Sequence, residues 1–356
     1  MRIIFDLGHP AHFHLFKHVI STLKSSDNDV ELIARQKDCL LDLLERSGWS
    51  YHIVPRASSG LAATGWQTLK TFKVALLLAR RKRTDFIVGT SLVAGPVARL
   101  TGAVSLIFSE DDAKEVPLFS KLTYPIAHYI ITPDCLKYEG HGKKHLTYSG
   151  YHELAYLHPN RYTPDPGILK ELGVGPDEKY FLVRLVSLTA HHDIGESGLG
   201  IEQVKTIVQR LARYGRVFIS TEAVVDSSLR NYILPTSVDR IFDVLAFAGM
   251  VVGTSQTMTI ESAVLGTPSI RCNTFVGRLT VIEELEHKYG LTAGFLPKDF
   301  GKLLDKMDEW LAQPDLKQKW QQKRQAMLAE CVDLTDWTLE LLNRLYLESR
   351  TEGNGL

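Results

Sequence analysis

Short apolar runs alternate with segments of helical periodicity through the first part of the chain. Apolar runs without helical spacing predict strands, whereas apolar residues three and four positions apart predict helices. We predict strands over residues 2–6, 29–34, 51–54, 85–88 and 104–108, and helices over 14–23, 38–47, 66–83 and 94–101. Strands that alternate with helices indicate a parallel sheet that is covered on both faces.

The alternation stops between about Gly150 and Lys179, where turn-forming residues are concentrated, and it then resumes. The second series predicts strands over 180–186, 216–220, 250–252 and 268–272, helices over 201–214, 225–231, 242–248 and 257–265, and a helical segment over 303–347. We therefore expect an N-terminal Rossmann-like domain over 1–160, a C-terminal one over 161–325 and a helical extension over 326–356.

The predicted fold class is α/β, with two doubly wound domains that face a cleft. Open parallel sheets bind ligands beyond the carboxyl ends of their strands, so the loops that follow the strands are the candidate site. No G-x-G-x-x-G, G-x-x-x-x-G-K-[ST] or G-x-S-x-G pattern follows a predicted strand. The usual sequence support for dinucleotide oxidoreductases, P-loop kinases and α/β-hydrolases is therefore missing.

Composition changes this picture little. Lys and Arg number 41 and Asp and Glu number 41, so no overall positive charge favours nucleic acid as a partner. The four cysteines are widely scattered and form neither a zinc motif nor a disulfide framework, which is typical of a reducing cytosol. Asp6 interrupts the first apolar run, and the longest apolar stretch, 241–252, is too short to span a bilayer. We expect a cytoplasmic protein.

The sharpest local pattern lies around the predicted strand 250–252. The strand leads into a turn of small residues from Gly253 to Ser255, and a helix begins near Thr257. A helix N-terminus offers backbone N–H groups and partial positive charge, which suit a diphosphate. Glu261 lies one turn further on the same face, where its carboxylate can accept hydrogen bonds from two ribose hydroxyls. An ordinary strand–turn–helix with a solvated Glu261 fits the same spacing.

Three segments together resemble a known family. They are Thr257-Met-Thr-x-Glu261-x-Ala-x-Leu-Gly-Thr-Pro268, Asp6-x-x-x-Pro10-x-His12-x-His14-x-Phe16, and Arg184 with His192-Asp193. The chain resembles the prokaryotic family called domain of unknown function 354 (DUF354), which is grouped with GT-B glycosyltransferases and nucleotide-sugar 2-epimerases. The matches lie in both halves and in the expected order, so the resemblance spans essentially the whole chain.

The resemblance implies a GT-B-like enzyme whose C-terminal half holds a nucleotide-sugar donor, most simply a UDP-sugar. It implies that Glu261 binds the ribose and that the turn before Thr257 and Met258 binds the diphosphate. Relatives tend to carry glycines directly before Thr257, where this chain has Ser255 and Gln256. A side chain at these two positions restricts the close approach of a diphosphate to the backbone.

Four histidines lie within ten residues of the first loop and helix. His14 and His18 are one helical turn apart, a spacing that zinc can use, but neither a third ligand nor a general-base glutamate accompanies them. We therefore expect no metal, and packing within the helix is the alternative for His18. His14 is a candidate substrate contact.

His12 is the candidate catalytic base. We expect it in the turn that leads into the first helix, at the carboxyl end of the first strand and facing the cleft. A neutral imidazole in that place can take the hydroxyl proton of an acceptor. The related peptidoglycan glucosaminyltransferase has a histidine in a similar glycine-rich first loop.

Further candidates follow the strands of the second half. A buried strand rarely carries an arginine without an anionic partner. For Arg184, the expected partner is a substrate phosphate or Asp193. His192 beside Asp193 resembles an oriented acid–base pair, with Asp193 catalytic and His192 in contact with substrate. Glu222 follows the strand 216–220, as His192 and Asp193 follow the strand 180–186.

Two features of the first half allow more than one interpretation. Glu110 and Asp112 are similar to the carboxylates that hold a metal in GT-A enzymes, but two doubly wound halves indicate GT-B, where helix ends and side chains supply the electrostatic help. Glu110 is thus an acceptor-side candidate or part of a solvated loop. Residues 70–83 combine an apolar stripe with a basic end. The basic end complements the helix dipole, or the segment contacts a membrane surface. The contact at a membrane would be with anionic headgroups or with a lipid-linked acceptor.

The expected activity is therefore metal-independent and cofactor-independent glycosyl transfer from a nucleotide sugar to an acceptor that the sequence does not identify. Cell-surface polysaccharide or glycolipid synthesis is the expected setting, with peripheral contact at the inner membrane face through residues 70–83. The alternatives are a nucleotide-sugar 2-epimerase or hydrolase of the same fold, and a sugar-nucleotide-binding protein without turnover.

Overall fold

The structure of the chain is a computed structural model, and it describes residues 1–37, 39–55, 61–136, 141–175, 177–185, 199–221 and 226–353. The chain forms two compact units. Unit 1 comprises Met1–Arg161 together with Val332–Leu356, and unit 2 comprises Tyr162–Cys331.

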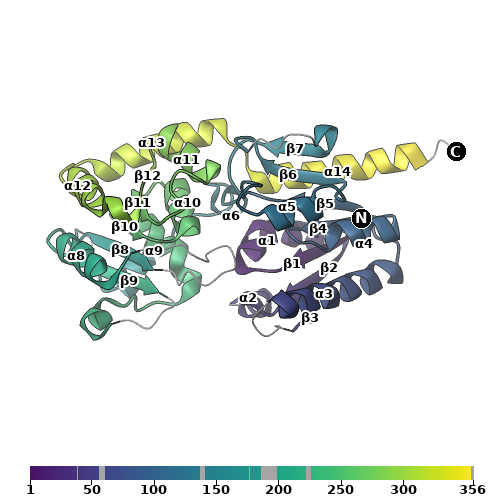
Figure 1. The fold of residues 1–356 in the computed structure, drawn as a ribbon, viewed down its shortest axis with the longest axis horizontal. Coiled ribbons are helices and arrows are strands. Elements are labelled where there is room, and N and C mark those ends of the chain that lie inside the picture. Colours follow the sequence, from purple (N-terminus) through teal and green to yellow (C-terminus); the bar gives the residue numbers. More distant parts are fainter. Residues whose placement is uncertain are drawn as a thin grey trace. The chain divides into compact units, whose positions relative to one another are not determined.

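Unit 1 is built on a seven-stranded parallel sheet with the order β3-β2-β1-β4-β5-β6-β7 (Figure 1). Every residue of the central strand β1 is buried, as expected for a strand with helices on both faces. The strands are β1 (Arg2–Leu7), β2 (Asp29–Arg35), β3 (His52–Val54), β4 (Phe86–Gly89), β5 (Val104–Phe108), β6 (Tyr129–Pro133) and β7 (His145–Tyr148).

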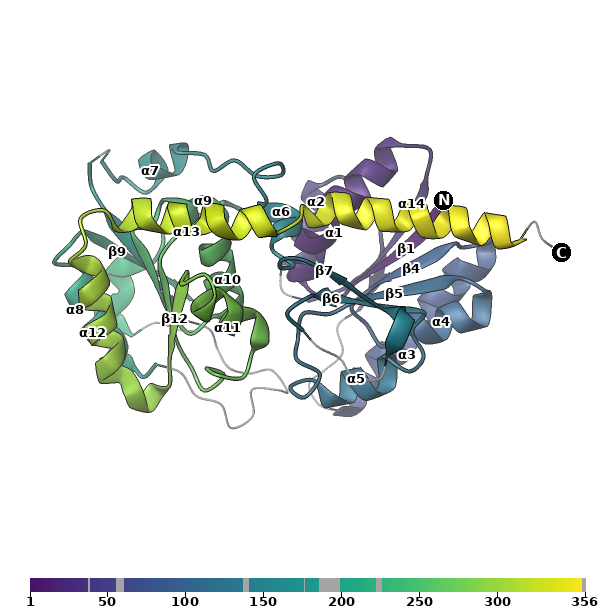
Figure 2. The same ribbon diagram turned by 90° about the horizontal axis from the view of Figure 1, so that it is seen from above.

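Helices cover both faces of this sheet (Figure 2). On one face, Phe16 of the first helix packs against Phe5 and Phe108, with ring centroids 5.4 and 5.2 Å apart. The helices of unit 1 are α1 (Pro10–Ser25), α2 (Leu40–Arg46), α3 (Leu61–Arg81), α4 (Ala94–Thr101), α5 (Pro117–Thr123), α6 (Leu154–Leu157) and α14 (Leu334–Gly353), with a 3-10 turn at Gly142–Lys144.

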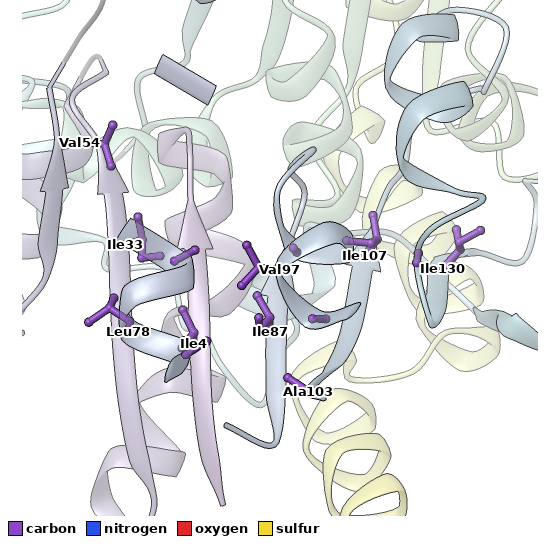
Figure 3. Close-up of a cluster of buried hydrophobic side chains, with 14 of the residues drawn as sticks. Ile4, Ile33, Val54, Leu78, Ile87, Val97, Ala103, Ile107 and Ile130 are labelled. Carbon is purple, nitrogen blue, oxygen red and sulfur yellow. The ribbon is translucent and has the colours of Figure 1, made fainter. Parts of the chain in front are cut away.

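The opposite face of the sheet forms the core shown in Figure 3. Branched side chains from alternate positions of the strands pack there against small residues of α3 and α4. Ile4, Ile87 and Ile107 are completely buried, and Ala94, Val97 and Ala98 of α4 approach them closely because their side chains are short. This packing positions the carboxyl ends of β1, β4 and β5.

Unit 2 contains a five-stranded parallel sheet with the order β12-β11-β10-β8-β9. Its strands are β8 (Tyr180–Leu185), β9 (Arg216–Thr221), β10 (Met250–Gly253), β11 (Ser269–Cys272) and β12 (Thr292–Phe295). Its helices are α7 (Gly167–Glu171), α8 (Ile201–Leu211), α9 (Ile241–Phe247), α10 (Gln256–Leu265), α11 (Thr280–His287), α12 (Phe300–Leu311) and α13 (Leu316–Glu330), with 3-10 turns at Ser227–Tyr232, Val238–Arg240 and Pro297–Asp299.

Helix α1 begins earlier than the sequence predicts, and this changes the position of His12. Pro10 occupies the first turn, and the side chain of His9 caps the helix by accepting a hydrogen bond from the Ala11 N–H at 3.1 Å. His12 therefore lies inside the first turn of α1 and not in a loop before it. The sequence predicts a helix only from His14 onward. The cap at His9 was not recognised, because histidine is an unusual capping residue.

The predicted helix over 225–231 is also wrong in its type and position. The described segment is a 3-10 turn over Ser227–Tyr232, which Asp226 caps through the N–H of Ser228. A short side chain that bonds to the following backbone favours a tight turn over a continuous helix.

The end of the chain also differs from the expected single helical segment. Three separate helices cover it, and the last of them, α14, packs against α1 and α6 of unit 1. Residue 326, where the sequence places the start of an extension, lies within α13 of unit 2. None of the helices in the described part of the chain is long and apolar enough to cross a bilayer.

Candidate functional site

Each sheet has one place where the chain connections leave in opposite directions. In unit 1 this switch point lies between β1 and β4, and in unit 2 it lies between β8 and β10. In open parallel sheets, ligands bind beyond the carboxyl ends of the strands at such a point. The residues that follow these strands are therefore the candidate site of each unit.

His12 lies at the switch point of unit 1. The N–H of Gly8, directly after β1, donates a hydrogen bond to Nδ1 of His12 at 3.1 Å. The hydroxyl oxygen of Thr90, directly after β4, lies 2.6 Å from Nε2 and 2.9 Å from Nδ1. A backbone N–H can only donate, so Nδ1 is the acceptor and the proton of a neutral ring is on Nε2. The ring therefore presents a donor to Thr90.

The surroundings of His12 keep its ring neutral at physiological pH. Burial lowers the pKa of His12 well below its ordinary value, and the positive charge of Arg35 lowers that pKa further, with smaller effects of His9, His152 and Lys37. A neutral histidine is what the general-base hypothesis needs. However, acceptance of a proton at Nε2 requires the other tautomer, in which Gly8 no longer donates to Nδ1.

Asp6 and Arg35 lie beside this loop. The Asp6 side chain is 1% exposed, and neither carboxylate oxygen has a hydrogen-bond partner in the described part of the chain. Nε of Arg35 is 4.0 Å from Oδ1 of Asp6, which is an ion-pair distance but too long for a hydrogen bond. The guanidinium group occupies the space beside Gly8, where a Cβ atom would lie 1.8 Å from Nη2. A glycine at position 8 thus lets Arg35 approach Asp6.

Glu110 follows β5 and pairs with a residue that the sequence analysis did not select. Nδ1 of His152 lies 3.3 Å from Oε2 of Glu110, and the side chain of His152 is nearly buried. The Tyr148 ring stacks on His152 at 6.2 Å. This contact is an ion pair when His152 is protonated, and the Glu110 side chain is 30% exposed, so both interpretations of Glu110 stay open.

His14 and His18 face the interior of unit 1. The ring of His14 packs against Tyr156 of α6, with centroids 5.2 Å apart. Burial, followed by the charge of Lys17, lowers the pKa of His14 to about 3 and that of His18 to about 4. In the part of the chain that the structure describes, no group of three His, Cys, Asp or Glu side chains is placed to hold a metal ion.

Arg184 lies at the switch point of unit 2. It pairs in register with Gly253 of β10 and Ser220 of β9, and its Nη1 donates to the Ser220 hydroxyl at 2.9 Å. A Cβ atom on Gly253 would lie 2.0 Å from the carbonyl oxygen of Arg184. The close approach of the two strands thus requires glycine at position 253.

Helix α10 begins directly after Gly253, Thr254 and Ser255. Ser255 is its N-cap, and the Ser255 hydroxyl accepts a hydrogen bond from the N–H of Met258 at 3.2 Å. Ser255 was a candidate contact for the diphosphate and a possible obstruction to it, and the structure gives it a further role as the N-cap of α10. Thr257 is exposed and Met258 is half-buried at this N-terminus.

Glu261 is 6% exposed on α10 and makes contacts with its surroundings. The interpretation as a solvated glutamate is therefore wrong. A carboxylate is seldom buried without a partner, which makes Glu261 a specifically placed acceptor close to the switch point. Three further candidates, His192, Asp193 and Glu222, lie outside the described residues.

Sequence reasoning missed His152, Thr90 and Arg35. Each follows or ends a strand of the unit 1 sheet, namely β7, β4 and β2. The signal that could have found Thr90 was its position in the loop that follows the predicted strand 85–88. His152 gave no such signal, because strand β7, with the sequence His-Leu-Thr-Tyr, has too few apolar residues to be recognised.

The fold and the two switch points define a class of protein: a two-domain α/β protein with a Rossmann-like parallel sheet in each domain. The family described as "Protein of unknown function (DUF354)" matches residues 1–285, and the chain belongs to this family. No curated protein matches the sequence.

Solved structures with this fold are GT-B glycosyltransferases and UDP-GlcNAc 2-epimerases. MnaA of S. aureus, in a co-structure with UDP, is 12% identical with a TM-score of 0.69 and covers 98% of this chain and 97% of its own. The UDP-GlcNAc 2-epimerase of Neisseria meningitidis, bound to UDP-GlcNAc, is 10% identical with a TM-score of 0.67, covering 98% and 100%. MurG of Acinetobacter baumannii is 12% identical with a TM-score of 0.61, covering 96% and 99%. At these identities the similarity establishes the fold alone.

Proposed function

We propose that the protein is a glycosyltransferase that uses a nucleotide-activated sugar, with a UDP-sugar as the simplest donor. One observation carries this proposal: the residues of the family motifs lie at the switch points of the two sheets, His12 in unit 1 and Arg184 and the β10–α10 turn in unit 2. The same-fold structures that hold UDP or UDP-GlcNAc support a uridine nucleotide as the ligand.

On the donor side, the proposed ligand contacts are in unit 2. The first turn of α10 would face the diphosphate with its backbone N–H groups, and Arg184 would add a positive charge at the neighbouring strand. Glu261 would accept hydrogen bonds from the ribose hydroxyls. Asp193, His192 and Glu222 belong to this proposal on the basis of the sequence.

On the acceptor side, the proposal assigns the chemistry to His12, with Glu110 and His14 as substrate contacts. In the general-base mechanism, the acceptor hydroxyl takes the place of Thr90 and transfers its proton to His12 while its oxygen forms a bond to the anomeric carbon of the sugar. The bond from that carbon to the diphosphate breaks, and UDP leaves. In the tautomer defined by the Gly8 contact, Nε2–H would instead donate a hydrogen bond to a substrate oxygen. A glutamine at position 12 could replace the hydrogen-bond donor of the second mechanism but not the proton acceptor of the first. This substitution therefore distinguishes the two mechanisms.

The second candidate function is 2-epimerisation or hydrolysis of a nucleotide sugar. The structure of the UDP-GlcNAc 2-epimerase from Neisseria meningitidis supports this alternative as strongly as the MurG structure supports transfer. Both candidates share the ligand and differ in the fate of the sugar. A binding protein without turnover is the third outcome. We further propose a cytoplasmic location, which the wide scatter of the four cysteines along the sequence supports, because they form neither a zinc motif nor a disulfide framework.

Thermal-shift measurements across nucleotides and nucleotide sugars test the ligand class first. A ligand at 100 times its Kd stabilises the folded chain by about 2.7 kcal/mol, which is easily measured as an increase in Tm. The proposal predicts stabilisation by uridine nucleotides. Equal shifts with every nucleotide, or none with any, would contradict it.

Product analysis with the stabilising sugar nucleotide then distinguishes the reactions. A new glycoside in the presence of acceptor extracts identifies a transferase. A changed sugar still bound to UDP identifies an epimerase that retains its nucleotide, and free UDP with a released sugar identifies a hydrolase or a hydrolysing epimerase. Saturable binding without any conversion identifies a binding protein.

A further inference from the structure

Three neighbouring helices of unit 1, α3, α4 and α5, contain no acidic residue. From Arg46 to Ser109 the chain has nine Lys and Arg residues but a single acid, Asp85. The carboxylate of Asp85 accepts a hydrogen bond from the backbone N–H of Arg2 at 2.7 Å. In a chain with equal numbers of acidic and basic residues, this is a strong local excess of positive charge.

Helix α3 has an unusual solvent face. Its inner face, which includes Ala75 and Leu78, is buried in the core of Figure 3. The outer face should be polar in an ordinary surface helix. Instead it combines large apolar side chains with basic ones: Trp66, Leu69, Lys73, Leu77 and Arg80, with Leu77 62% exposed.

The apolar character continues onto the neighbouring helices. Leu118 and Leu122 of α5 are 65% and 50% exposed, and Leu100 of α4 is 57% exposed. α4 packs against α3, and the Arg99 side chain of α4 donates to the carbonyl of Ile126, just after α5, at 3.2 Å. The three helices therefore present a common outer surface, which we call the α3–α5 face (Figure 2).

The helix dipole does not explain this pattern. It favours basic residues in the last turn of a helix, which accounts for Arg80 and Arg81 but not for Lys73 or for any leucine. α14 offers a contrast within unit 1, since its exposed Leu347 lies on a helix that also carries Asp336, Glu340 and Glu348. Single exposed leucines are ordinary, whereas a group of them on three helices that carry basic but no acidic residues is not, although Asp111, Asp112 and Glu115 lie in the loop before α5.

We propose that the α3–α5 face binds the surface of an anionic lipid bilayer. Basic residues are attracted to anionic headgroups, and exposed Trp and Leu side chains insert at the boundary between headgroups and acyl chains. Neither charge attraction nor apolar insertion alone gives stable attachment, but the α3–α5 face offers both contributions. A nucleic acid would interact with the basic residues but would leave the exposed leucines in contact with water. This proposal does not depend on the proposed function.

Vesicle flotation of the full chain tests the proposal. The probes are vesicles of phosphatidylcholine alone and vesicles in which about a third of the lipid is phosphatidylglycerol. We expect at least about tenfold tighter binding to the anionic vesicles, and loss of most of that binding when NaCl is raised from about 0.1 M to 1 M, where the Debye length falls from about 10 to 3 Å. No flotation at low salt overturns the proposal.

Variants separate the two contributions. Leu77→Ser with Leu118→Ser removes apolar contacts, and Arg80→Gln with Arg81→Gln removes charge. We expect each pair to lower the partition coefficient about tenfold or more with no change in Tm, because these side chains are exposed. The matched controls on α14, Leu347→Ser and Arg344→Gln, should bind like the parent chain.

Two results would contradict this assignment. If the α14 controls lose as much binding as the α3–α5 variants, the attraction is not located on this face. If the leucine pair changes self-association in sedimentation but leaves vesicle binding intact, the face is a contact between protein molecules. The folded state of each variant is verified by its melting curve, so a loss of binding is not caused by unfolding.

Discussion

At the scale of single residues, one contact distinguishes the two nitrogens of His12. The Thr90 hydroxyl, which can donate or accept, lies within hydrogen-bond distance of both nitrogens, whereas the backbone N–H of Gly8 donates to Nδ1 alone. Residue type alone predicted a base, whereas the contact with Gly8 points to a neutral ring that donates from Nε2. The distinction can be measured.

We expect His12→Ala to lower turnover by about 10²- to 10⁴-fold, the usual effect of a lost proton-transfer group, with nucleotide affinity close to that of the parent. The amide N–H of His12→Gln can replace an Nε2–H donor but not a base. Activity of the Gln variant well above that of the Ala variant would therefore favour the donor mechanism, and equal losses the base mechanism. Parent-level activity in both variants would remove His12 from the chemistry.

Glu261 is expected to act on affinity and not on chemistry. A hydrogen bond to a charged acceptor contributes about 1.5–3 kcal/mol, so Glu261→Gln should weaken UDP binding by about 10- to 150-fold in calorimetry. Glutamine is the better replacement than alanine because the site is buried and alanine would leave a cavity. Unchanged affinity in a folded Glu261→Gln protein would defeat the ribose assignment.

His14 links stability to pH. Its folded-state pKa of about 3 lies below the unfolded value of 6.5, so the unfolded chain binds more protons between these values. The contribution of His14 is therefore complete above pH 6.5 and is lost as the pH falls toward 3. One such group gives a slope of up to about 1.4 kcal/mol per pH unit in the free energy of unfolding.

The variant His14→Phe keeps a ring against Tyr156 but cannot be protonated. Denaturant unfolding at pH 7, 6, 5 and 4 should show a smaller loss of stability at low pH in this variant than in the parent. His287→Phe is the control, because the side chain of His287 is 71% exposed. Parallel pH curves for parent and His14→Phe would show that burial does not affect the protonation of His14.

At the scale of elements, the turn between β10 and α10 depends on a backbone contact. Gly253 lies so close to the carbonyl of Arg184 that a Cβ atom there requires movement of one strand. Movement of β10 would also displace the N-cap Ser255 and the first turn of α10. The stability of unit 2 and the position of the N-terminus of α10 are thus coupled through one glycine.

We expect Gly253→Ala to destabilise the protein by about 1–3 kcal/mol or more, as measured by chemical denaturation, because the clash is with backbone and not with a flexible side chain. Gly301→Ala in α12 is the matched control. A Cβ atom at Gly301 meets no atom within 4 Å, and alanine favours a helix, so this variant should be unchanged or up to about 1 kcal/mol more stable. Similar results for the two variants would show that β10 and β8 are not this close.

At the scale of the whole molecule, the C-terminal helix completes the N-terminal unit. The side chain of Thr335 donates to the carbonyl of Ala155 at 2.8 Å, Asp333 pairs with Arg161 at 2.7 Å, and the Val332 N–H donates to the carbonyl of Ser149 at 3.0 Å. Leu341 and Leu342 are buried in unit 1. The chain therefore returns to its first unit after it has built the second.

Leu342→Ala should therefore destabilise unit 1 by about 2–5 kcal/mol, the usual cost of a leucine-sized cavity. Hydrogen exchange should show the loss of protection within residues 1–161, far from the substitution in sequence, with residues 162–331 little affected. Leu347→Ala, at a 64% exposed position, should change stability by less than about 0.5 kcal/mol. Loss of protection centred on unit 2 would contradict this arrangement.

Local patterns were sufficient for much of the fold. The strands β1, β2 and β5 and helix α4 lie within one residue of their predicted bounds, because a continuous apolar run or a helical stripe depends only on neighbours in sequence. The turn before α10 was recognised for the same reason, as were the strand ends that place His12 and Arg184. Strands β6, β7 and β12 were not predicted. β7 and β12 are each four residues long and contain small or polar side chains, whereas β6, with the sequence Tyr-Ile-Ile-Thr-Pro, has an apolar run that was overlooked.

The tertiary structure decided the properties that depend on contacts between residues far apart in the chain. The contact of Glu110 with His152 joins positions 42 residues apart, and the contact of His12 with Thr90 joins positions 78 residues apart. The burial of Glu261 and the exposure of Leu77 and Leu118 likewise depend on which helix faces which sheet. By itself, the sequence determined the class of fold and the loops that carry the candidate chemistry. Partners, tautomers and exposed surfaces required the packed chain, because they arise from contacts that no local pattern specifies.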